Sequence, residues 1–374
     1  MARKPIAKPR PASPDQPAVD TQRRRGRGAR TNLTGRFDAQ LREDFDDGWE
    51  GLGELEAFKT EIRLEQAKRI ISTNDSPDIG FDQSINPYRG CEHGCIYCYA
   101  RPTHCYLGLS AGLDFESVLI AKTNTAERLE HELSRPGYQV KTIALGTNTD
   151  PYQPIEKTYT LTRQILEIMD RTSHPVGIVT KSALVLRDID LLASLAKRGL
   201  TKVCLSVTSL DHRLSRKMEP RASTPERRIE AIARLSEAGV PTGVMVAPII
   251  PAINDAEIEA ILERCAEAGA SRAGSVLLRL PLEISGLFQE WLEEEFPERA
   301  RRVMSLVRQT RGGKDYVSEW RERQTGAGPY AELIWQRFRL ATARLGLNSD
   351  RTPLRCDLFD PPRAPSPQFD LFKS

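Results

Sequence analysis

A short apolar run leads into three closely spaced cysteines in the stretch Ser84-Ile-Asn-Pro-Tyr-Arg-Gly-Cys91-Glu-His-Gly-Cys95-Ile-Tyr-Cys98. Thiolates so near one another are soft ligands, which select iron–sulfur clusters, zinc or copper(I). A [4Fe–4S] cubane has four irons, so three protein thiolates leave one iron open to another ligand. The stretch therefore predicts a strand followed by a metal-binding loop, with Cys91, Cys95 and Cys98 as the ligands.

Around this stretch, short apolar runs alternate with longer amphipathic segments. Six candidate strands cover residues 84–88, 141–145, 176–180, 202–207, 242–247 and 275–280. Apolar residues at three- and four-residue steps predict helices over residues 124–134, 161–171, 188–197, 225–238 and 255–268. The alternation predicts a parallel α/β fold, either an open sheet or a barrel, in which chemistry gathers at the carboxyl ends of the strands.

The flanking regions differ in composition from this α/β part. Charged helical patterns over residues 289–310 and 329–345 predict a C-terminal helical extension, and the Pro-rich residues 352–367 predict a linker. We expect five regions in all. They are a disordered basic arm (1–36), an N-terminal extension (37–80), the α/β part (81–282), the helical extension (283–351) and a Pro-rich tail (352–374).

The bulk properties indicate a reduced, cytoplasmic protein without a membrane partner. No run of about 18 or more apolar residues occurs, and the first residues, Met1-Ala-Arg-Lys-Pro, lack the apolar core of a secretory signal. Seven cysteines, three of them clustered, do not suggest a disulfide framework in a chain of 374 residues.

Positive charge is concentrated near the N-terminus. The first 36 residues hold ten basic and two acidic side chains. A Pro- and Gly-rich segment of this kind cannot bury a core, and its charge attracts phosphate backbones through counterion release. Nucleic acid, and DNA in particular, is therefore the expected partner, and the alternative is a solvated tail that aids solubility.

The C-x3-C-x2-C spacing, with Tyr97 before the last cysteine, resembles the cysteine loop of the radical S-adenosylmethionine (SAM) enzymes. The resemblance covers about residues 80–282. It implies a partial (β/α)6 TIM-like barrel with a C-terminal helical extension, a [4Fe–4S] cluster on the three cysteines, and SAM on the open iron. It also implies an external electron donor and reductive cleavage of SAM to a 5′-deoxyadenosyl radical, which abstracts hydrogen from a substrate.

Five segments near the strand ends narrow the resemblance to the branch related to spore photoproduct lyase, which repairs a thymine lesion in DNA. They are Gly146-Thr-Asn-Thr-Asp-Pro-Tyr-Gln-Pro-Ile-Glu156, Val179-Thr-Lys-Ser182, Leu205-Ser-Val-Thr-Ser209, Glu219-Pro220 and Ala247-Pro-Ile-Ile-Pro251. The resemblance implies that Lys181 and Ser206 hold the carboxylate and the ribose of SAM. A zwitterionic ligand needs a cation, hydrogen bonds to its ribose and apolar walls for its base. The alternative is that Lys181 is only a solvated cation on a loop and binds no ligand.

The same resemblance implies further contacts with SAM. The backbone at Tyr97 and near Ala247 would lie against the adenine, and Thr147 or Asn148 would lie close to the sulfonium. Tyr97 and Tyr99 flank the last cysteine as they do in that enzyme, which makes them candidate hydrogen relays. The alternative is that both rings only pack against the cluster.

One departure from that enzyme limits the substrate. In spore photoproduct lyase a cysteine at the end of the second strand returns a hydrogen atom to the product. Here the strand ends Ala144-Leu-Gly146-Thr147, without a cysteine. Lyase chemistry by that route is therefore not expected, and the resemblance leaves the substrate open.

Two alternatives to a DNA-directed radical SAM enzyme follow from the residues. His93, His104 and Cys105 lie near the three cysteines and offer further ligands for zinc, which would suit a non-catalytic, DNA-associated module. The other alternative is a radical SAM enzyme that modifies RNA or a protein.

The C-terminal Gln368-Phe-Asp-Leu371-Phe372 resembles the short motif by which bacterial DNA repair proteins dock on the sliding clamp. In that mode Leu371 and Phe372 would enter an apolar pocket and Gln368 would form a hydrogen bond nearby. The alternative is that both apolar side chains fold back onto the protein's own helices.

Overall fold

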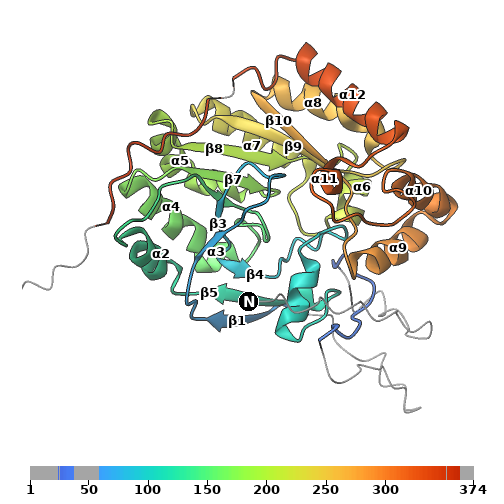
Figure 1. Cartoon of the computed structure of the whole chain (residues 1–374), viewed down its shortest axis with the longest axis horizontal. Coiled ribbons are helices and arrows are strands. Elements are labelled where there is room, and N and C mark those ends of the chain that lie inside the picture. Colours follow the sequence, from blue (N-terminus) through green and yellow to red (C-terminus); the bar gives the residue numbers. More distant parts are fainter. Residues whose placement is uncertain (1–23, 25, 38–58, 351, 363–374) are drawn as a thin grey trace, which may run out of the picture.

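A seven-stranded sheet forms the centre of the molecule (Figure 1). The computed structural model describes residues 24, 26–37, 59–350 and 352–362. The strand order is β10-β9-β8-β7-β6-β3-β2, with β2 antiparallel to β3 and the other neighbours parallel. The strands are β2 (Ile71–Thr73), β3 (Gln83–Ile85), β6 (Ile143–Leu145), β7 (Val176–Thr180), β8 (Thr201–Ser206), β9 (Thr242–Ile249) and β10 (Arg272–Leu277). The predicted arrangement of six parallel strands is confirmed, and β2 adds an antiparallel edge that was not predicted.

Five helices cover the outer face of this sheet (Figure 1). They are α2 (Thr125–Leu133), α4 (Leu161–Arg171), α5 (Ile189–Lys197), α7 (Pro225–Glu237) and α8 (Ile258–Glu267), which confirms the five predicted helices. Their apolar stripes pack on alternate residues of the strands, such as the fully buried Val176 and the nearly buried Ile178 of β7. The apolar faces of the helices and the outer face of the sheet pack against each other and form the main hydrophobic core.

The inner face of the sheet is less tightly covered. Strand side chains alternate between faces, and the inward set includes Val179, Lys202, Cys204 and Met245, all of which are partly exposed. Bulky buried side chains fill the interior of a closed barrel. Partly exposed side chains therefore line the inner face here, which is open and not a packed core.

A second sheet of three strands lies beside the first (Figure 1). It consists of β1 (Glu61–Glu65), β5 (Val118–Lys122) and β4 (Tyr88–Arg89). The predicted single strand over residues 84–88 is wrong, because β3 ends at Ile85 and Tyr88 belongs to this other sheet. Pro87 lies at the break, where it has no N–H with which to continue a ladder.

The chain after β10 forms the C-terminal helices (orange and red in Figure 1). The predicted helix over residues 289–310 is wrong, since the structure has two helices there, α9 (Ile284–Glu295) and α10 (Pro297–Gln309). Proline is tolerated at the first position of a helix but would disrupt the interior of a continuous one.

The predicted strand over residues 275–280 is also displaced, because β10 begins at Arg272 and ends at Leu277.

The remaining helices are short or lie at the edge of the molecule. They are η2 (Arg101–Leu107), α1 (Asp114–Ser117), α3 (Glu156–Tyr159), η3 (Ala183–Asp188), α6 (His212–Met218), η4 (Asp255–Glu257), α11 (Glu322–Thr325) and α12 (Pro329–Arg344). The last of these matches the predicted helix over residues 329–345 and packs on α8. Within the described ranges, none of the helices has the length and apolar character needed to span a membrane.

Part of the basic N-terminal region packs onto the domain. Residue 24 and residues 26–36, which we call the strap, run beside η2 and α9 (dark blue in Figure 1). Arg30 forms ion pairs with Glu294 and Glu295, and Arg36 pairs with Glu283. The prediction of a disordered arm is wrong for these residues, because carboxylates of the C-terminal region neutralise their arginines. Residues 1–23 and 25 lie outside the described part.

Residues 352–362 also pack against the domain. The backbone N–H of Arg355 donates to the Gly199 carbonyl at 3.0 Å, and that of Asp360 donates to the Thr172 carbonyl at 2.9 Å. The Phe359 ring lies 5.2 Å from His174, so the prediction of a free linker is wrong here. The motif residues Gln368, Leu371 and Phe372 lie outside the described residues, and their docking on a clamp stays a prediction.

Candidate active site

Residues 91–98, the cysteine loop, connect β4 to η2. The N–H of Cys91 donates to the Phe115 carbonyl at 2.9 Å, and that of Cys98 donates to the Cys95 carbonyl at 3.2 Å. Cys91 and Cys95 are buried, and Cys98 is partly exposed. Besides burial, Cys95 and Cys98 raise the pKa of Cys91, and Cys98 raises the pKa of Cys95. The fold therefore gathers the predicted metal ligands on one side of a single loop.

The charge around the three thiols is controlled by burial and by one lysine. Burial raises the pKa of all three, that of Cys95 to about 12. The pKa of Lys181 is raised because, although burial lowers it, the nearby Cys95 and Glu219 raise it more. Its Nζ lies 5.8 Å from the centre of the Tyr97 ring. Thiolates formed on metal binding would thus have a cation beside them.

Side chains from the loop after β6 contact the cysteine loop and fix its position. Gln153, which is fully buried, accepts a hydrogen bond from the Glu92 N–H at 3.0 Å and donates to the Gly90 carbonyl at 3.1 Å. Asp150 accepts from the Lys181 N–H at 2.8 Å, and its carboxylate lies 3.3 Å from His93 Nδ1. Burial would raise the pKa of Asp150, but His93 and the hydrogen bonds to its carboxylate lower it to about 2. Asp150 therefore stays ionised and ties Lys181 to the cysteine loop.

A second buried carboxylate lies on the opposite side of the loop. Glu219 accepts hydrogen bonds from the hydroxyls of Tyr97 and Thr208, and it forms an ion pair with Arg228. Burial raises the pKa of Glu219, but Arg228 and Lys181 outweigh it, so the net shift is downward. The Tyr97 hydroxyl is thus held in a buried network.

Tyr99 faces a different environment from Tyr97. Its side chain is 46% exposed, compared with 7% for Tyr97. Its hydroxyl donates to the Thr147 carbonyl, and its ring centre lies 4.9 Å from the Arg279 guanidinium. Of the two candidate relays, the one accessible from the open inner face is Tyr99.

The predicted SAM-binding residues end neighbouring strands around this loop. Asn86 anchors the β6 end, because its Nδ2 donates to Thr147 Oγ1 at 3.1 Å and its Oδ1 accepts from the Asn148 N–H at 3.0 Å. Ser206 ends β8, where its carbonyl accepts from Arg228, and Ala247 lies on β9. The structure brings Lys181 to the Tyr97 ring and Thr147 to the Tyr99 hydroxyl. It places Ser206 and Ala247 on the adjoining strands.

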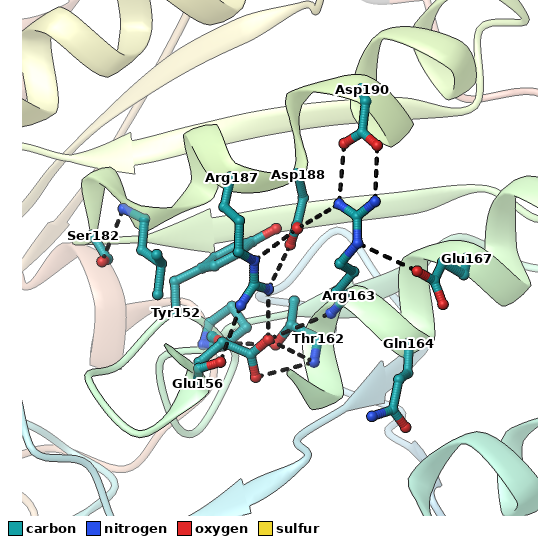
Figure 2. Close-up of polar contacts among 12 residues, drawn as sticks. Tyr152, Glu156, Thr162, Arg163, Gln164, Glu167, Ser182, Arg187, Asp188 and Asp190 are labelled. Carbon is teal, nitrogen blue, oxygen red and sulfur yellow. Dashed lines mark hydrogen bonds and ion pairs between the residues drawn. The ribbon is translucent and has the colours of Figure 1, made fainter. Parts of the chain in front are cut away.

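A buried ion network supports the β6 loop (Figure 2). Glu156 and Asp188 are fully buried, and Arg187 bridges them at 2.7 and 2.8 Å. Arg163 extends the network by pairing with Asp188 and with Asp190. Because Glu156 begins α3, directly after the loop that carries Asp150 and Gln153, the network fixes the end of that loop.

Three thiols on one short loop have the soft-ligand chemistry that a [4Fe–4S] cluster requires. In a cubane each thiolate binds its own iron, whereas zinc requires its ligands about 2.0–2.3 Å from one point. Among the described residues, no three His, Cys, Asp or Glu side chains are gathered as the ligands of a single metal ion. The other zinc candidates bond elsewhere. His93 pairs with Asp150, His104 Nε2 lies 2.9 Å from the Val118 carbonyl, and Cys105 is buried in the core.

The fold and the site define a metal-cluster protein built on an open α/β barrel, and comparison with known proteins identifies its family. The Radical SAM superfamily matches residues 85–265. Rv2578c of Mycobacterium tuberculosis (strain ATCC 25618 / H37Rv), an uncharacterised protein, is 39% identical over 230 residues, which are 61% of this chain and 68% of that protein. The chain therefore belongs to the radical SAM superfamily, whose enzymes use a [4Fe–4S] cluster and SAM.

Two further comparisons show similarity to other proteins. The Radical SAM Nalpha-GlyT isomerase of Pseudomonas phage M6 is 25% identical over 275 residues, which are 71% of this chain and 53% of that protein. The structure of spore photoproduct lyase complexed with dinucleoside spore photoproduct aligns with a TM-score of 0.56 at 16% identity. The alignment covers 76% of this chain and 80% of that chain. This likeness confirms the expected fold.

Several residues that shape the site were not singled out from the sequence. Asp150 and Glu219 fall in segments that resemble the family. Their buried partners were missed, because His93 was considered only as a zinc ligand and Arg228 carries no local signal. Arg101 is fully buried and donates to the Cys95 carbonyl at 2.9 Å. A fully buried arginine is rare unless it is paired, yet nothing in its sequence neighbourhood marks it as buried.

Proposed function

We propose that this radical SAM enzyme holds its cluster on Cys91, Cys95 and Cys98 and acts on a nucleic acid, with DNA as the preferred substrate. When bound, the cluster and SAM supply a carbon radical that abstracts hydrogen, with one electron taken from an external donor. The observation that carries the substrate class is a cationic hollow beside the cysteine loop.

The hollow has a volume of about 490 Å³ and reaches the cysteine loop at His93. Its charged lining consists of the exposed cations Lys157, Arg221, Arg227 and Arg234 and, among the described lining residues, one carboxylate, that of Glu230. An excess of cations around a hollow attracts a phosphate backbone through counterion release. RNA carries the same phosphates, so the choice of DNA is left to the experiment.

The proposed roles of the nearby side chains follow from their contacts. Lys181 would bind the carboxylate of SAM, because Asp150 and Glu219 hold it beside Cys95. Ser206 would contact the ribose, the backbone at Tyr97 and Ala247 would face the adenine, and Thr147 or Asn148 would lie near the sulfonium. These assignments extend the family resemblance to the positions where the structure places these residues.

We assign the hydrogen relay, where one is used, to Tyr99 and not to Tyr97. Tyr99 is half-exposed and its hydroxyl donates to a backbone carbonyl, whereas Tyr97 is buried and its hydroxyl donates to the Glu219 carboxylate. A thiol relay at the end of β6 does not fit this backbone. A Cβ on Gly146 would lie 1.9 Å from the Val179 carbonyl oxygen, and the φ of this glycine is +86°. The chemistry therefore differs from that of a lyase with a thiol at this position.

The test uses anaerobic protein with SAM, a reductant and oligonucleotides deuterated on their sugars and bases. We expect 5′-deoxyadenosine to form and to gain deuterium from DNA, and a Cys95→Ala variant to form none. Transfer from RNA alone would redirect the proposal to RNA. Absence of SAM cleavage by cluster-loaded wild type would refute the enzyme assignment, and cleavage without transfer from either polymer would refute the nucleic-acid substrate.

A further inference from the structure

The strap lies directly on the cysteine loop. Gly28 has no side chain, and a Cβ placed on it would stand 1.9 Å from the carbonyl oxygen of Gly94. Non-bonded carbon and oxygen atoms do not approach so closely, so only glycine fits at this position while the loop keeps its conformation. The backbone of the strap therefore touches the turn between Cys91 and Cys95.

One buried carboxylate joins the strap to the loop. Glu116 is fully buried, and its two oxygens accept the N–H groups of Gly28 and Ala29, each at 2.8 Å. The same carboxylate pairs with Arg101, which donates to the carbonyls of Cys95 at 2.9 Å and Gly94 at 3.1 Å. The contacts run from the strap through Glu116 and Arg101 to the backbone that carries the cysteines.

A second chain of contacts reaches the other side of the loop. Arg27 donates to the Glu116 carbonyl and, at 3.1 Å, to Thr60 Oγ1. Thr60 donates to the Glu92 carboxylate at 2.6 Å, and Arg221 pairs with the same carboxylate at 2.7 Å. Glu92 follows Cys91 directly, so the strap is linked to both ends of the Cys91–Cys95 turn, at Gly94 by direct contact and at Glu92 through Thr60.

The strap is held at its own ends by the C-terminal helices. Arg24 and Arg30 pair with Glu294, and the Thr31 hydroxyl donates to Glu290 at 2.9 Å. These carboxylates belong to α9, which lies far from the cysteine loop in sequence. The strap thus links the C-terminal region to the cluster-binding turn.

We infer that the strap positions the cysteine loop for its cluster, with Gly28, Glu116 and Arg101 as positioning residues. The inference rests on the proposed assignment of Cys91, Cys95 and Cys98 as ligands. Partners that orient metal ligands affect metal affinity by about 10- to 100-fold. Coupling between two binding events is also reciprocal, so a bound cluster must hold the strap in place more firmly.

The first test compares Gly28→Ala with Gly80→Ala, where an added Cβ meets nothing within 4 Å. Both variants are reconstituted anaerobically and challenged with an iron chelator. We expect Gly28→Ala to lose its visible cluster absorbance about tenfold faster than wild type or more, and Gly80→Ala to match wild type. Equal rates for the two variants, with both proteins folded by circular dichroism, would overturn the inference.

The second test needs no substitution in the strap. Trypsin cleaves after arginine, and Arg27 and Arg30 are buried. Cluster loading should slow cleavage at these sites by about fivefold or more in wild type. It should have no such effect in a Cys91→Ser/Cys95→Ser/Cys98→Ser variant. Identical cleavage of loaded and unloaded wild type would also overturn the inference.

The triple variant separates the two proposals. If it still binds the cluster, the ligand assignment fails whatever the strap does. If it loses the cluster while Gly28→Ala keeps it as firmly as wild type, the assignment stands and the positioning role fails. Glu116→Gln, which preserves side-chain size, provides a second variant should Gly28→Ala not fold, and we expect the same faster loss of the cluster.

Discussion

Two groups of charged side chains lie next to each other behind the cysteine loop and differ in almost every respect. In the ion network of Figure 2, Glu156 and Asp188 are fully buried and each carboxylate is paired with arginine. In the hollow, the cations are exposed. Arg221 pairs with Glu92 and Arg227 with Glu230, whereas Lys157 and Arg234 pair with none of the described carboxylates. Glu156 and Lys157 are neighbours in the chain, yet the first belongs to the network and the second to the hollow.

The difference shows that the partners of an arginine, and not its presence, decide whether its charge can attract a ligand. The two charges of a buried pair stay together, because removing one partner leaves an uncompensated charge in a medium of low dielectric. A solvent-exposed cation with few acidic neighbours is not neutralised, so its electrostatic potential can attract a polyanion. The strap arginines belong with the first group, because Glu283, Glu294 and Glu295 pair with them.

The largest effect is expected from Arg187→Ala. This change leaves the buried Glu156 and Asp188 without one of their counter-charges, so the free energy of unfolding should fall by about 3 kcal/mol. Lys157→Ala, from the exposed group, should change it by less than about 0.5 kcal/mol. Urea unfolding of the cluster-free proteins measures both. If both variants lost a similarly small amount of unfolding free energy, the buried network and the exposed cations would not differ in their effect on stability.

A buried group that stays neutral gives a pH test of the same principle. His174 is fully buried, its Nδ1 lies 3.0 Å from the Pro175 carbonyl, and its Nε2 lies 2.9 Å from the Tyr138 hydroxyl. Burial lowers its pKa to about 4. Since the unfolded chain has a histidine pKa of about 6.5, protonation favours unfolding. The contribution of neutral His174 to the free energy of unfolding is complete above about pH 6.5. It falls by roughly 3 kcal/mol as the pH drops to about 4.

The measurement is the unfolding free energy of wild type and His174→Gln as a function of pH. The two values should differ most near pH 7 and converge as the pH falls through this window. Parallel curves for the two proteins would show that His174 does not titrate with folding.

A smaller effect is expected on binding in the hollow. Arg227→Ala/Arg234→Ala should weaken DNA binding about tenfold and reduce the slope of log affinity against log salt by about 2, if each arginine contacts one phosphate. Arg301→Ala/Arg302→Ala removes the same charge from exposed positions of α10. Fluorescence anisotropy over a salt series measures both variants. Equal weakening would mean that net charge, and not the hollow, attracts DNA.

The regular elements were predictable because their signals are local. Apolar alternation located the six parallel strands and the five outer helices, and cysteine spacing located the metal-binding loop. The failures also have local causes. Pro87 and Pro297 each divided a continuous apolar pattern, because proline lacks the N–H that a ladder or a helix interior requires.

Contacts between distant residues were not predictable from such patterns. The sequence shows an excess of positive charge in residues 1–36, which indicated a disordered arm. The structure pairs Arg24 and Arg30 with Glu294, roughly 270 residues away. No periodicity links residues so far apart, because only folding brings them together.

The sequence by itself determined the class of chemistry, since three thiols at this spacing and the strand–helix alternation are properties of neighbouring residues. Only the tertiary structure decided how these thiols are held and which cations remain available. Glu116 and Arg101 join the strap to the cysteine loop, and the hollow keeps a net positive charge because Lys157 and Arg234 pair with none of the described carboxylates. The physical reason is that burial and pairing set the energy of a charge, and both depend on residues that become neighbours only in the folded protein.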